Sequence, residues 1–323
     1  MVKRLRQRER GIALLAVLMG VALMTLIVVD FTTVATLGYL SAANQANELR
    51  AYYLAKSSVA IGLGLLGQDA RNKAASKNQL PDTLNDIWAT PYPQTKVDGG
   101  IASLSIVDEN RKININQMVN PSNGQQIKNS VLILERLFAV LGVSNQIIPA
   151  LIEWISPPGN NIGGAGLDYY ARLIPPYAPR NGPMPTIGDL KMVAGVDEAT
   201  FLVLKQFLTV VPQPQANGGI VVNINTAPPE VIAALVPELT ENPTLVKEIV
   251  LARMLRPFAK TTDVGNLPGV GTFSTRLMQV LTTQSKYFTI SATGSFAGSR
   301  KMVYAVFQRQ SNGTALLASW REE

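Results

Sequence analysis

The chain has 323 residues, of which 47% are hydrophobic and 16% charged, enough for one membrane segment and two modest domains. It has no cysteine and no histidine, which excludes disulfides, metal sites built on those residues, and Ser-His or Cys-His nucleophile pairs. The net charge is +7, but residues 1–11 hold five of the 29 basic and one of the 22 acidic residues, so +3 remains for the rest. Most of the excess of basic residues therefore lies beside the apolar run, where it sets the orientation of a membrane segment and does not indicate a ligand-binding patch.

The first thirty residues predict a membrane anchor. Residues 1–10 contain five basic side chains, and residues 11–29 then run without a charge. A helix over that run is about 28 Å long, roughly the thickness of the hydrocarbon core of a bilayer. The positive-inside rule keeps the basic flank in the cytoplasm and places the rest across the membrane. We therefore expect a single-pass inner-membrane protein with a periplasmic C-terminal part.

The position of the small residue relative to the apolar run distinguishes between kinds of leader peptide. A secretory signal peptide carries a small-residue cleavage site after its apolar run, whereas here the run continues into VVDFTTVATLGYL. A plain signal anchor is a second hypothesis. Basic residues, Gly11 and then the apolar run from Ile12 resemble the leader of type IV pilins and type II secretion pseudopilins. In those families a membrane peptidase cuts after the glycine and methylates the new N-terminus, which implies cleavage between Gly11 and Ile12 and N-methylation of Ile12.

A long helix is predicted over residues 12–67. Proline is absent from residues 1–80, and apolar residues recur at spacings of three and four. Residues 12–30 are expected in the membrane, and the remainder is expected to pack on a soluble domain through Tyr52 and Tyr53. The polar, proline-containing residues 68–100 predict a loop that Trp88 pins to the body.

Two separated segments predict a sheet packed on this helix. Residues 101–107 and 112–116 alternate as strands, with a hairpin turn at 108–110. Residues 287–296 and 301–310 form a second predicted hairpin. The sheet domain is thus expected in residues 68–116 and 285–310, with a tail, 311–323, that adds little.

Residues 117–284 predict a helical domain inserted into the sheet domain. Helical periodicity is found in 127–155, 187–194, 198–208 and 229–255, interrupted by a proline- and glycine-rich segment. Residues 219–225 repeat the Ile-Asn pattern of 113–116 and are a candidate strand returning to the sheet. The predicted fold class is α+β: a long N-terminal helix on a small antiparallel sheet, with a large inserted all-helical domain.

One segment gives an alternative function. Residues 223–271 resemble a helix-hairpin-helix module with its hairpin at 267–271, which in DNA-binding versions faces a phosphate. However, Arg276 is the only basic residue in the ten after Gly271, and no aromatic-plus-basic stripe accompanies it. A packing turn is therefore favoured, and a membrane-anchored DNA-binding protein is the alternative hypothesis.

Four acids lie in or near the proline- and glycine-rich segment. Calcium takes six to eight oxygen ligands, and these acids show no spacing typical of such a site, so ordinary surface acids are expected; they are Glu153, Asp168, Asp189 and Asp197. No carboxylate pair or phosphate-binding glycine loop indicates an enzyme. We expect no cofactor, with calcium as the alternative.

Several motifs together resemble one family over nearly the whole chain. They are the leader, the long helix, DENRKININ (108–116), EWISPP (153–158), GAGLDYY (164–170), VNINTAPPEV (222–231) and the closing strands. Their order is similar to that of the K-class minor pseudopilins of type II secretion systems, the GspK family. The resemblance implies a pilin-like fold with an inserted helical domain, in a subunit that caps a periplasmic fibre. It implies I- and J-class minor pseudopilins, the major pseudopilin, the prepilin peptidase and secreted substrates as partners, and no nucleic acid.

Two departures from the usual patterns are informative. Most pilins carry a glutamate at the fifth mature position, whose charge pairs with the terminal amine of the subunit above; here that position is Ala16. A tip subunit has nothing above it and needs no such acid.

K-class members usually show D-W-x-D-x-D and G-A-E-D-x-Y-Y, whose acids bind calcium, and only Glu153 and Asp168 are left of them here. We expect the prolines to rigidify the loop in place of calcium.

Overall fold

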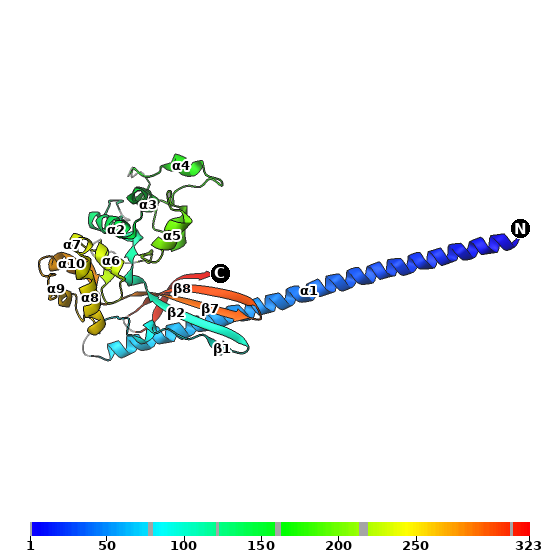
Figure 1. Cartoon of the computed structure of the whole chain (residues 1–323), viewed down its shortest axis with the longest axis horizontal. Coiled ribbons are helices and arrows are strands. Elements are labelled where there is room, and N and C mark those ends of the chain that lie inside the picture. Colours follow the sequence, from blue (N-terminus) through cyan, green and yellow to red (C-terminus); the bar gives the residue numbers. More distant parts are fainter. Residues whose placement is uncertain (1, 77–79, 121–122, 159–162, 213–218, 311–312) are drawn as a thin grey trace.

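A computed structural model shows one very long helix with a two-part body at its C-terminal end (Figure 1). It describes residues 2–76, 80–120, 123–158, 163–212, 219–310 and 313–323, with the backbone alone for residues 2–10. The helix α1 spans Val2–Ala74, and its N-terminal half projects away from the body.

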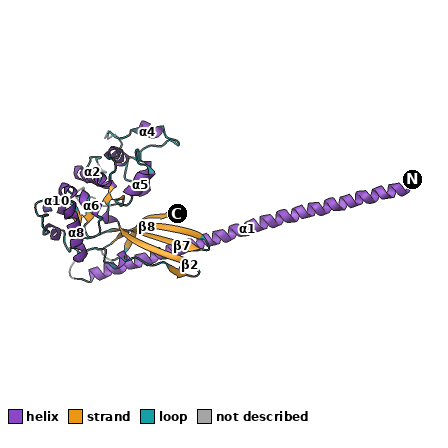
Figure 2. Ribbon diagram, in the orientation of Figure 1, coloured by secondary structure: helices purple, strands orange, loops and turns teal. Residues whose placement is uncertain are grey.

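The body contains a sheet next to α1 and a helical part beyond it (Figure 2). The strands are β1 (Thr95–Val97), β2 (Gly100–Asp108), β3 (Ile113–Asn114), β4 (Leu208–Thr209), β5 (Val222–Asn223), β6 (Leu281–Thr282), β7 (Tyr287–Phe296), β8 (Ser299–Arg309) and β9 (Ala315–Glu322). The other α-helices are α2 (Lys128–Leu141), α3 (Ile148–Ile155), α4 (Leu167–Ala171), α5 (Glu198–Leu204), α6 (Pro229–Ala234), α7 (Pro237–Glu241), α8 (Pro243–Leu255), α9 (Thr262–Gly265) and α10 (Ser274–Met278). Short 3₁₀ helices are η1 (Ile87–Ala89), η2 (Glu109–Arg111), η3 (Ile115–Gln117), η4 (Asn145–Ile147) and η5 (Ile187–Met192).

The five-stranded sheet is antiparallel, in the order β1-β2-β7-β8-β9, and one of its faces packs on α1. Small residues let the helix approach closely: a Cβ on Gly294 of β7 would lie 2.0 Å from the Ala51 carbonyl oxygen. Ala55 and Val59 are buried in this contact, together with Phe288 and Ile290 of β7. The predicted α+β class, with a long helix on an antiparallel sheet, is confirmed.

Trp88 holds the connection after α1, as expected. Its ring is buried 5.0 Å from that of Phe288, and its indole N–H donates to Asp86. The β7–β8 hairpin turns at Ala297 and Gly298, both with positive φ.

The length of α1 differs from the prediction, because the helix continues past residue 67 to Ala74. The glycines near residue 67 do not end the helix. Gly62 packs closely against β7, where a Cβ would lie 3.0 Å from the Ile290 side chain.

Both Ile-Asn segments were wrongly predicted as strands of this sheet. After Asp108 the chain turns through η2 instead of forming a hairpin, and β3 pairs in parallel with β4. Likewise β5 pairs in parallel with β6, so 219–225 does not return to the five-stranded sheet. The asparagines account for this: Asn114 and Asn223 each accept a hydrogen bond from the backbone N–H two residues on, which favours a turn over a continuing strand.

The C-terminal tail was also wrongly predicted to add little, because residues 315–322 form the edge strand β9. Ala315 and Trp320 pack against the core between α1 and the sheet. The strand lacks a clear alternation because the β8–β9 register shifts between Val306 and Phe307, which leaves Ala318 as an extra residue.

The inserted domain has its own core, centred on α2, α3 and α6. The predicted helix over 229–255 is three helices, which begin at Pro229, Pro237 and Pro243, because proline favours the first turn of a helix and interrupts a continuous one. The predicted helix at 187–194 is the 3₁₀ helix η5.

A buried polar network joins the inserted domain to the sheet. The Asp108 carboxylate, at the end of β2, accepts hydrogen bonds from the hydroxyls of Thr226 (2.5 Å) and Ser285 (2.6 Å) and from the Asn223 amide (3.3 Å). All four side chains are buried, and no ion pair of the described residues involves Asp108. Burial raises the pKa of Asp108 to about 6, although the hydroxyls oppose the shift.

We predict that Asp108→Asn changes how stability depends on pH. Because the pKa of Asp108 is 3.8 unfolded and about 6 folded, the native state binds the proton more tightly, and the wild type loses up to about 3 kcal/mol as pH rises between these values. The variant cannot titrate, so its stability relative to the wild type should rise over that interval and stay level above it. Thermal unfolding of the full chain in detergent micelles measures this. Glu241→Gln, at an exposed acid, is the control, and parallel profiles for wild type and Asp108→Asn would contradict the prediction.

Candidate functional site

The N-terminal part of α1 is an exposed apolar rod. Within the described residues, α1 alone is long and apolar enough to cross a membrane, and no residue of its most apolar window, of mean hydropathy 2.9, is buried. A core helix would bury this surface, so the rod fits lipid or neighbouring helices. The threonine hydroxyls of this segment donate to carbonyls four residues earlier at 2.7–2.9 Å, and so need no partner in lipid; they belong to Thr25, Thr32, Thr33 and Thr36.

The residues predicted for processing and assembly lie on this rod. Gly11 sits within α1 with open space around it, and Ile12 and Ala16 are exposed. The first acid after Gly11 is Asp30. Cleavage between Gly11 and Ile12 and methylation of Ile12 stay predictions.

Beyond residue 30, α1 keeps an apolar exposed surface up to the sheet. Tyr52 is half-buried near Glu322, but Tyr53 is 55% exposed, so the expectation that it lies in the domain contact was wrong. Tyr53 instead belongs to a set of exposed apolar residues along the helix: Phe31, Val34, Leu37, Tyr39, Leu40, Leu49, Tyr53 and Ile61. This surface can pack against the helices of other subunits.

Among the described residues, Glu153 and Asp168 are not brought together as a calcium site. Both Glu153 oxygens accept a hydrogen bond from the Gly166 N–H, at 3.1 and 3.2 Å. Asp168 lies in the first turn of α4, exposed, and these two acids are not among the described carboxylates that converge. The Ser156 hydroxyl donates a hydrogen bond to the Ile152 carbonyl oxygen at 2.6 Å. Within the part of the loop that the structure describes, the side chains offer fewer than the six to eight oxygens that calcium takes, so the absence of calcium stays a prediction.

Aromatic side chains hold this loop instead. The ring of Trp154, on α3, lies 5.6 Å from that of Tyr170 on α4 and 6.2 Å from that of Tyr177. The Tyr170 hydroxyl accepts a hydrogen bond from the Ala194 N–H, which joins the loop to the segment before α5. Packed aromatic pairs of this kind stabilise structure without a metal.

The other two acids singled out from the sequence have local structural roles. Asp189 accepts a hydrogen bond from the Thr186 hydroxyl at 2.9 Å. Asp197 caps α5 by accepting from the Thr200 N–H at 2.8 Å, and hydrogen bonding with Thr200 lowers the pKa of Asp197. Neither acid therefore needs a metal to account for its position.

An acidic cluster that the sequence did not indicate lies between α1 and the loop after it. The carboxylates of Asp69, Asp82 and Asp86 converge, but Lys73 pairs with all three, and Arg309 of β8 pairs with Asp69 (2.8 Å) and Asp82 (2.5 Å). Burial lowers the pKa of Lys73, and the carboxylates of Asp82 and Asp86 outweigh that effect and raise it. The ammonium group therefore takes the place that a cation would need.

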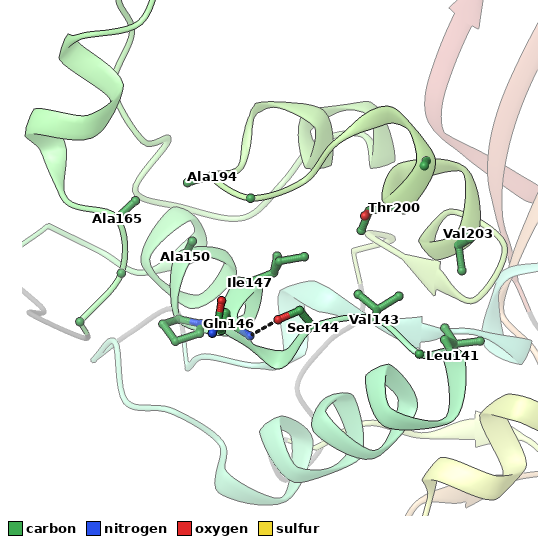
Figure 3. A pocket seen from close by; sticks show the side chains of 16 residues that line it. Leu141, Val143, Ser144, Gln146, Ile147, Ala150, Ala165, Ala194, Thr200 and Val203 are labelled. Carbon is green, nitrogen blue, oxygen red and sulfur yellow. Dashed lines mark hydrogen bonds between the residues drawn. The ribbon is translucent and has the colours of Figure 1, made fainter.

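A pocket of about 650 Å³ lies in the inserted domain, between the start of α3, the segment 163–165 and α5 (Figure 3). Small apolar residues form most of its wall, among them Ala150, Ala165 and Ala194. Its hydroxyls belong to Ser144, which caps the Gln146 N–H at 3.3 Å, and Thr200. No titratable side chain is among the described residues that line it, so these residues offer no acid, base or activated nucleophile.

The helix-hairpin-helix-like segment is used for packing. Its turn brings Gly269, with φ +79°, against the Leu245 side chain of α8. Arg276, the basic residue five positions after the hairpin, pairs with Glu238 of α7. An arginine held in an intramolecular ion pair is not free to neutralise a phosphate.

Comparisons with known proteins agree on one family. Residues 111–213 and 222–284 match two models described as type II secretion system (T2SS), protein K, which together span about half of the chain. The chain is 26% identical over 318 residues to type II secretion system protein K of Pseudomonas aeruginosa, covering 96% of this chain and 91% of that protein. It is 28% identical over 247 residues to the Klebsiella pneumoniae protein of the same name, covering 73% of each.

A solved structure shares the fold. The crystal structure of the GspK–GspI–GspJ complex from the type 2 secretion system of enterotoxigenic Escherichia coli contains a chain that matches with a TM-score of 0.72. The match covers 88% of this chain and 99% of that chain, at 17% identity. It supports a pilin-like sheet with an inserted helical domain. None of these comparisons supports the DNA-binding alternative.

We predict that calcium does not stabilise the folded chain. A site that binds calcium with micromolar affinity would add about 4 kcal/mol of stability in millimolar calcium. The thermal midpoint of the full chain in micelles should instead be the same in calcium and in the chelator EDTA. Glu153→Gln should lower it equally in both, because the Gly166 N–H loses a charged acceptor, while Asp168→Asn should change little. A calcium-dependent rise that either substitution abolishes would contradict this.

Proposed function

This chain belongs to the type II secretion protein K family, which makes it a minor pseudopilin, and we propose that it caps the tip of the pseudopilus and initiates its assembly. The observation that carries the proposal is the apolar rod of α1, which has no acid at Ala16 or anywhere between Gly11 and Asp30. In the bilayer a terminal amine is costly to leave unpaired, so the subunit that lies below it must supply an acid.

The missing acid gives the subunit a direction. After cleavage its own amine, on Ile12, pairs with an acid of the subunit below, while Ala16 offers nothing to a subunit above. Such a chain can begin a fibre but cannot lie within it. Its export role is then to start the fibre that supports protein secretion across the outer membrane, with no enzymatic step of its own.

Partners and location follow from the same helix. The I- and J-class minor pseudopilins pack on the exposed surface of residues 31–67, and the major pseudopilin continues the fibre below. The related GspK forms a complex with GspI and GspJ, which supports this choice of partners. The basic residues before Gly11 hold the N-terminus in the cytoplasm and the body in the periplasm, anchored in the inner membrane until assembly.

Processing is tested by Gly11→Ala. We expect the wild-type protein, purified from cells with a prepilin peptidase, to begin at Ile12 with one added methyl group by intact-mass analysis. Gly11→Ala should keep the eleven-residue leader, because the resemblance places the cut after this glycine. Gly20→Ala is the matched control, since Gly20 also lies on α1 with open space around it. Normal cleavage of Gly11→Ala would rule out the peptidase assignment.

The position in the fibre is tested by Ala16→Glu. Antibody labelling of fibres in electron micrographs should find the wild-type protein only at fibre ends. Ala16→Glu should bring part of the label into the fibre, because the new carboxylate can accept the amine of a subunit above, without raising the amount of protein secreted. Ala22→Glu, on the same rod and at a position that is not the fifth of the mature chain, is the control. Wild-type label along the whole fibre would disprove the tip assignment.

A further inference from the structure

The two edges of the five-stranded sheet differ in how they are protected. At one edge β1 has only three residues, Pro91 and Pro93 come shortly before it, and Lys96 lies within it. Short strands, prolines and lysines are the usual means by which an edge avoids pairing with another chain. The edge at β1 is therefore closed to partners.

The edge at β9 lacks these three protections, and its bulge at Ala318 and its charges at Arg321 and Glu322 leave residues 315–317 without either. The strand is eight residues long, contains no proline, and has its first charge at Arg321. In the part of the chain that the structure describes, no strand pairs with its outer side. Met302 and Glu323 exchange both backbone hydrogen bonds, at 2.8 and 2.9 Å, so alternation points the N–H and C=O groups of Trp320 and Glu322 away from β8.

Apolar side chains flank this open edge on both faces. Leu317 lies opposite Phe307, on the face that carries α1, and is 55% exposed. Leu316 lies opposite Gln308, on the other face, and is 57% exposed. A strand placed against β9 would cover both leucines through cross-strand pairs.

A cleft of about 1190 Å³ adjoins the same strand. It is bounded by the sheet face turned away from α1, including Ser319 and Arg321 of β9, and by residues 183–212 of the inserted domain. Across it, the ammonium groups of Lys191 and Lys205 lie 4.5 and 5.6 Å from the Phe201 ring centre. Lys191 pairs with Glu198, whereas the ion pairs of the described residues do not include Lys205, so the cleft favours an acidic side chain in its occupant.

We propose that β9 receives an extended strand of a partner minor pseudopilin at the fibre tip, which adds a sixth strand to the sheet and places a carboxylate near Lys205. Main-chain hydrogen bonds supply affinity in this mode of binding, and the flanking side chains supply specificity. The inference rests on the proposed function, because it takes its partner from the I and J classes. A second copy of this chain and an exported protein are the competing occupants.

Hydrogen exchange of the full chain in micelles tests the pairing at the level of the backbone. In the chain alone, the outward amides of Trp320 and Glu322 should exchange fast. With the I- and J-class pseudopilins of the same cell added, these amides should slow by about tenfold or more. A complex that forms without this protection overturns the β9 inference and leaves the tip assignment standing. Failure to form any complex counts against the proposed function itself.

A pair of substitutions tests the surface. Leu317→Lys places a charge at the open edge and should weaken the complex about tenfold. Leu132→Lys, at a 49% exposed leucine of α2, should leave affinity unchanged. Equal effects of the two variants overturn the inference. Protection of β9 in the chain alone that grows with its concentration would identify a second copy as the occupant and also overturn it. If Leu317→Lys does not fold, the hydrogen exchange of Trp320 and Glu322 in the unaltered chain tests the β9 inference alone.

Discussion

The close packing of α1 on the sheet is the contact on which the rest of the structure depends. One helix enters lipid at one end and forms half of a hydrophobic core at the other, so any force along the fibre reaches the body through this contact. The approach is close because Gly294 faces the backbone of Ala51 and small residues follow at Ala55. In closely packed interiors even one added or removed methyl group changes stability, so this contact is specific as well as strong.

Charged and polar groups then fix the inserted domain on this base. Lys73 and Arg309 tie the end of α1 and the end of β8 to the same acids, and Asp82 also accepts from the Ser285 N–H at 2.6 Å. Ser285 in turn bonds to Asp108, so the ionic cluster and the seam of the inserted domain form one continuous network. Buried networks of this kind gain little net stability over apolar packing, but they favour a single arrangement of the parts they join. For a tip subunit, that arrangement sets where the inserted domain lies relative to the fibre axis.

The sequence predicted the elements whose signals are local. The absence of proline and the spacing of apolar residues were sufficient for α1, and strict alternation was sufficient for β7 and β8. The predictions from sequence were wrong where a side chain or a bulge interrupts the regular pattern. The side chains of Asn114 and Asn223 accept backbone hydrogen bonds that end a strand in a turn, and the bulge in β9 breaks its alternation of apolar and polar residues. The ionic cluster could not have been predicted, because Asp69 and Arg309 are 240 positions apart and nothing in their spacing joins them. The weakness of the calcium site was predicted from the acids that are missing and stays a prediction; the hydrogen bond from the Gly166 N–H to Glu153 had no signal in the sequence.

The two ends of the subunit place different constraints on a partner. In lipid, helices gain little from apolar contact alone, because the lipid tails are as apolar as the side chains, so the pairing of amine and acid decides which subunit can lie above another. In the periplasm water competes for every hydrogen bond, and an open edge such as β9 offers a row of donors and acceptors in fixed register. A subunit that offers no acid at Ala16 but an accessible edge at β9 accepts partners beside it and below it, and none above. Under the proposed function, the direction of assembly would follow from the carboxylate that is missing at Ala16 in the membrane and from the open outer edge of β9 in the periplasm.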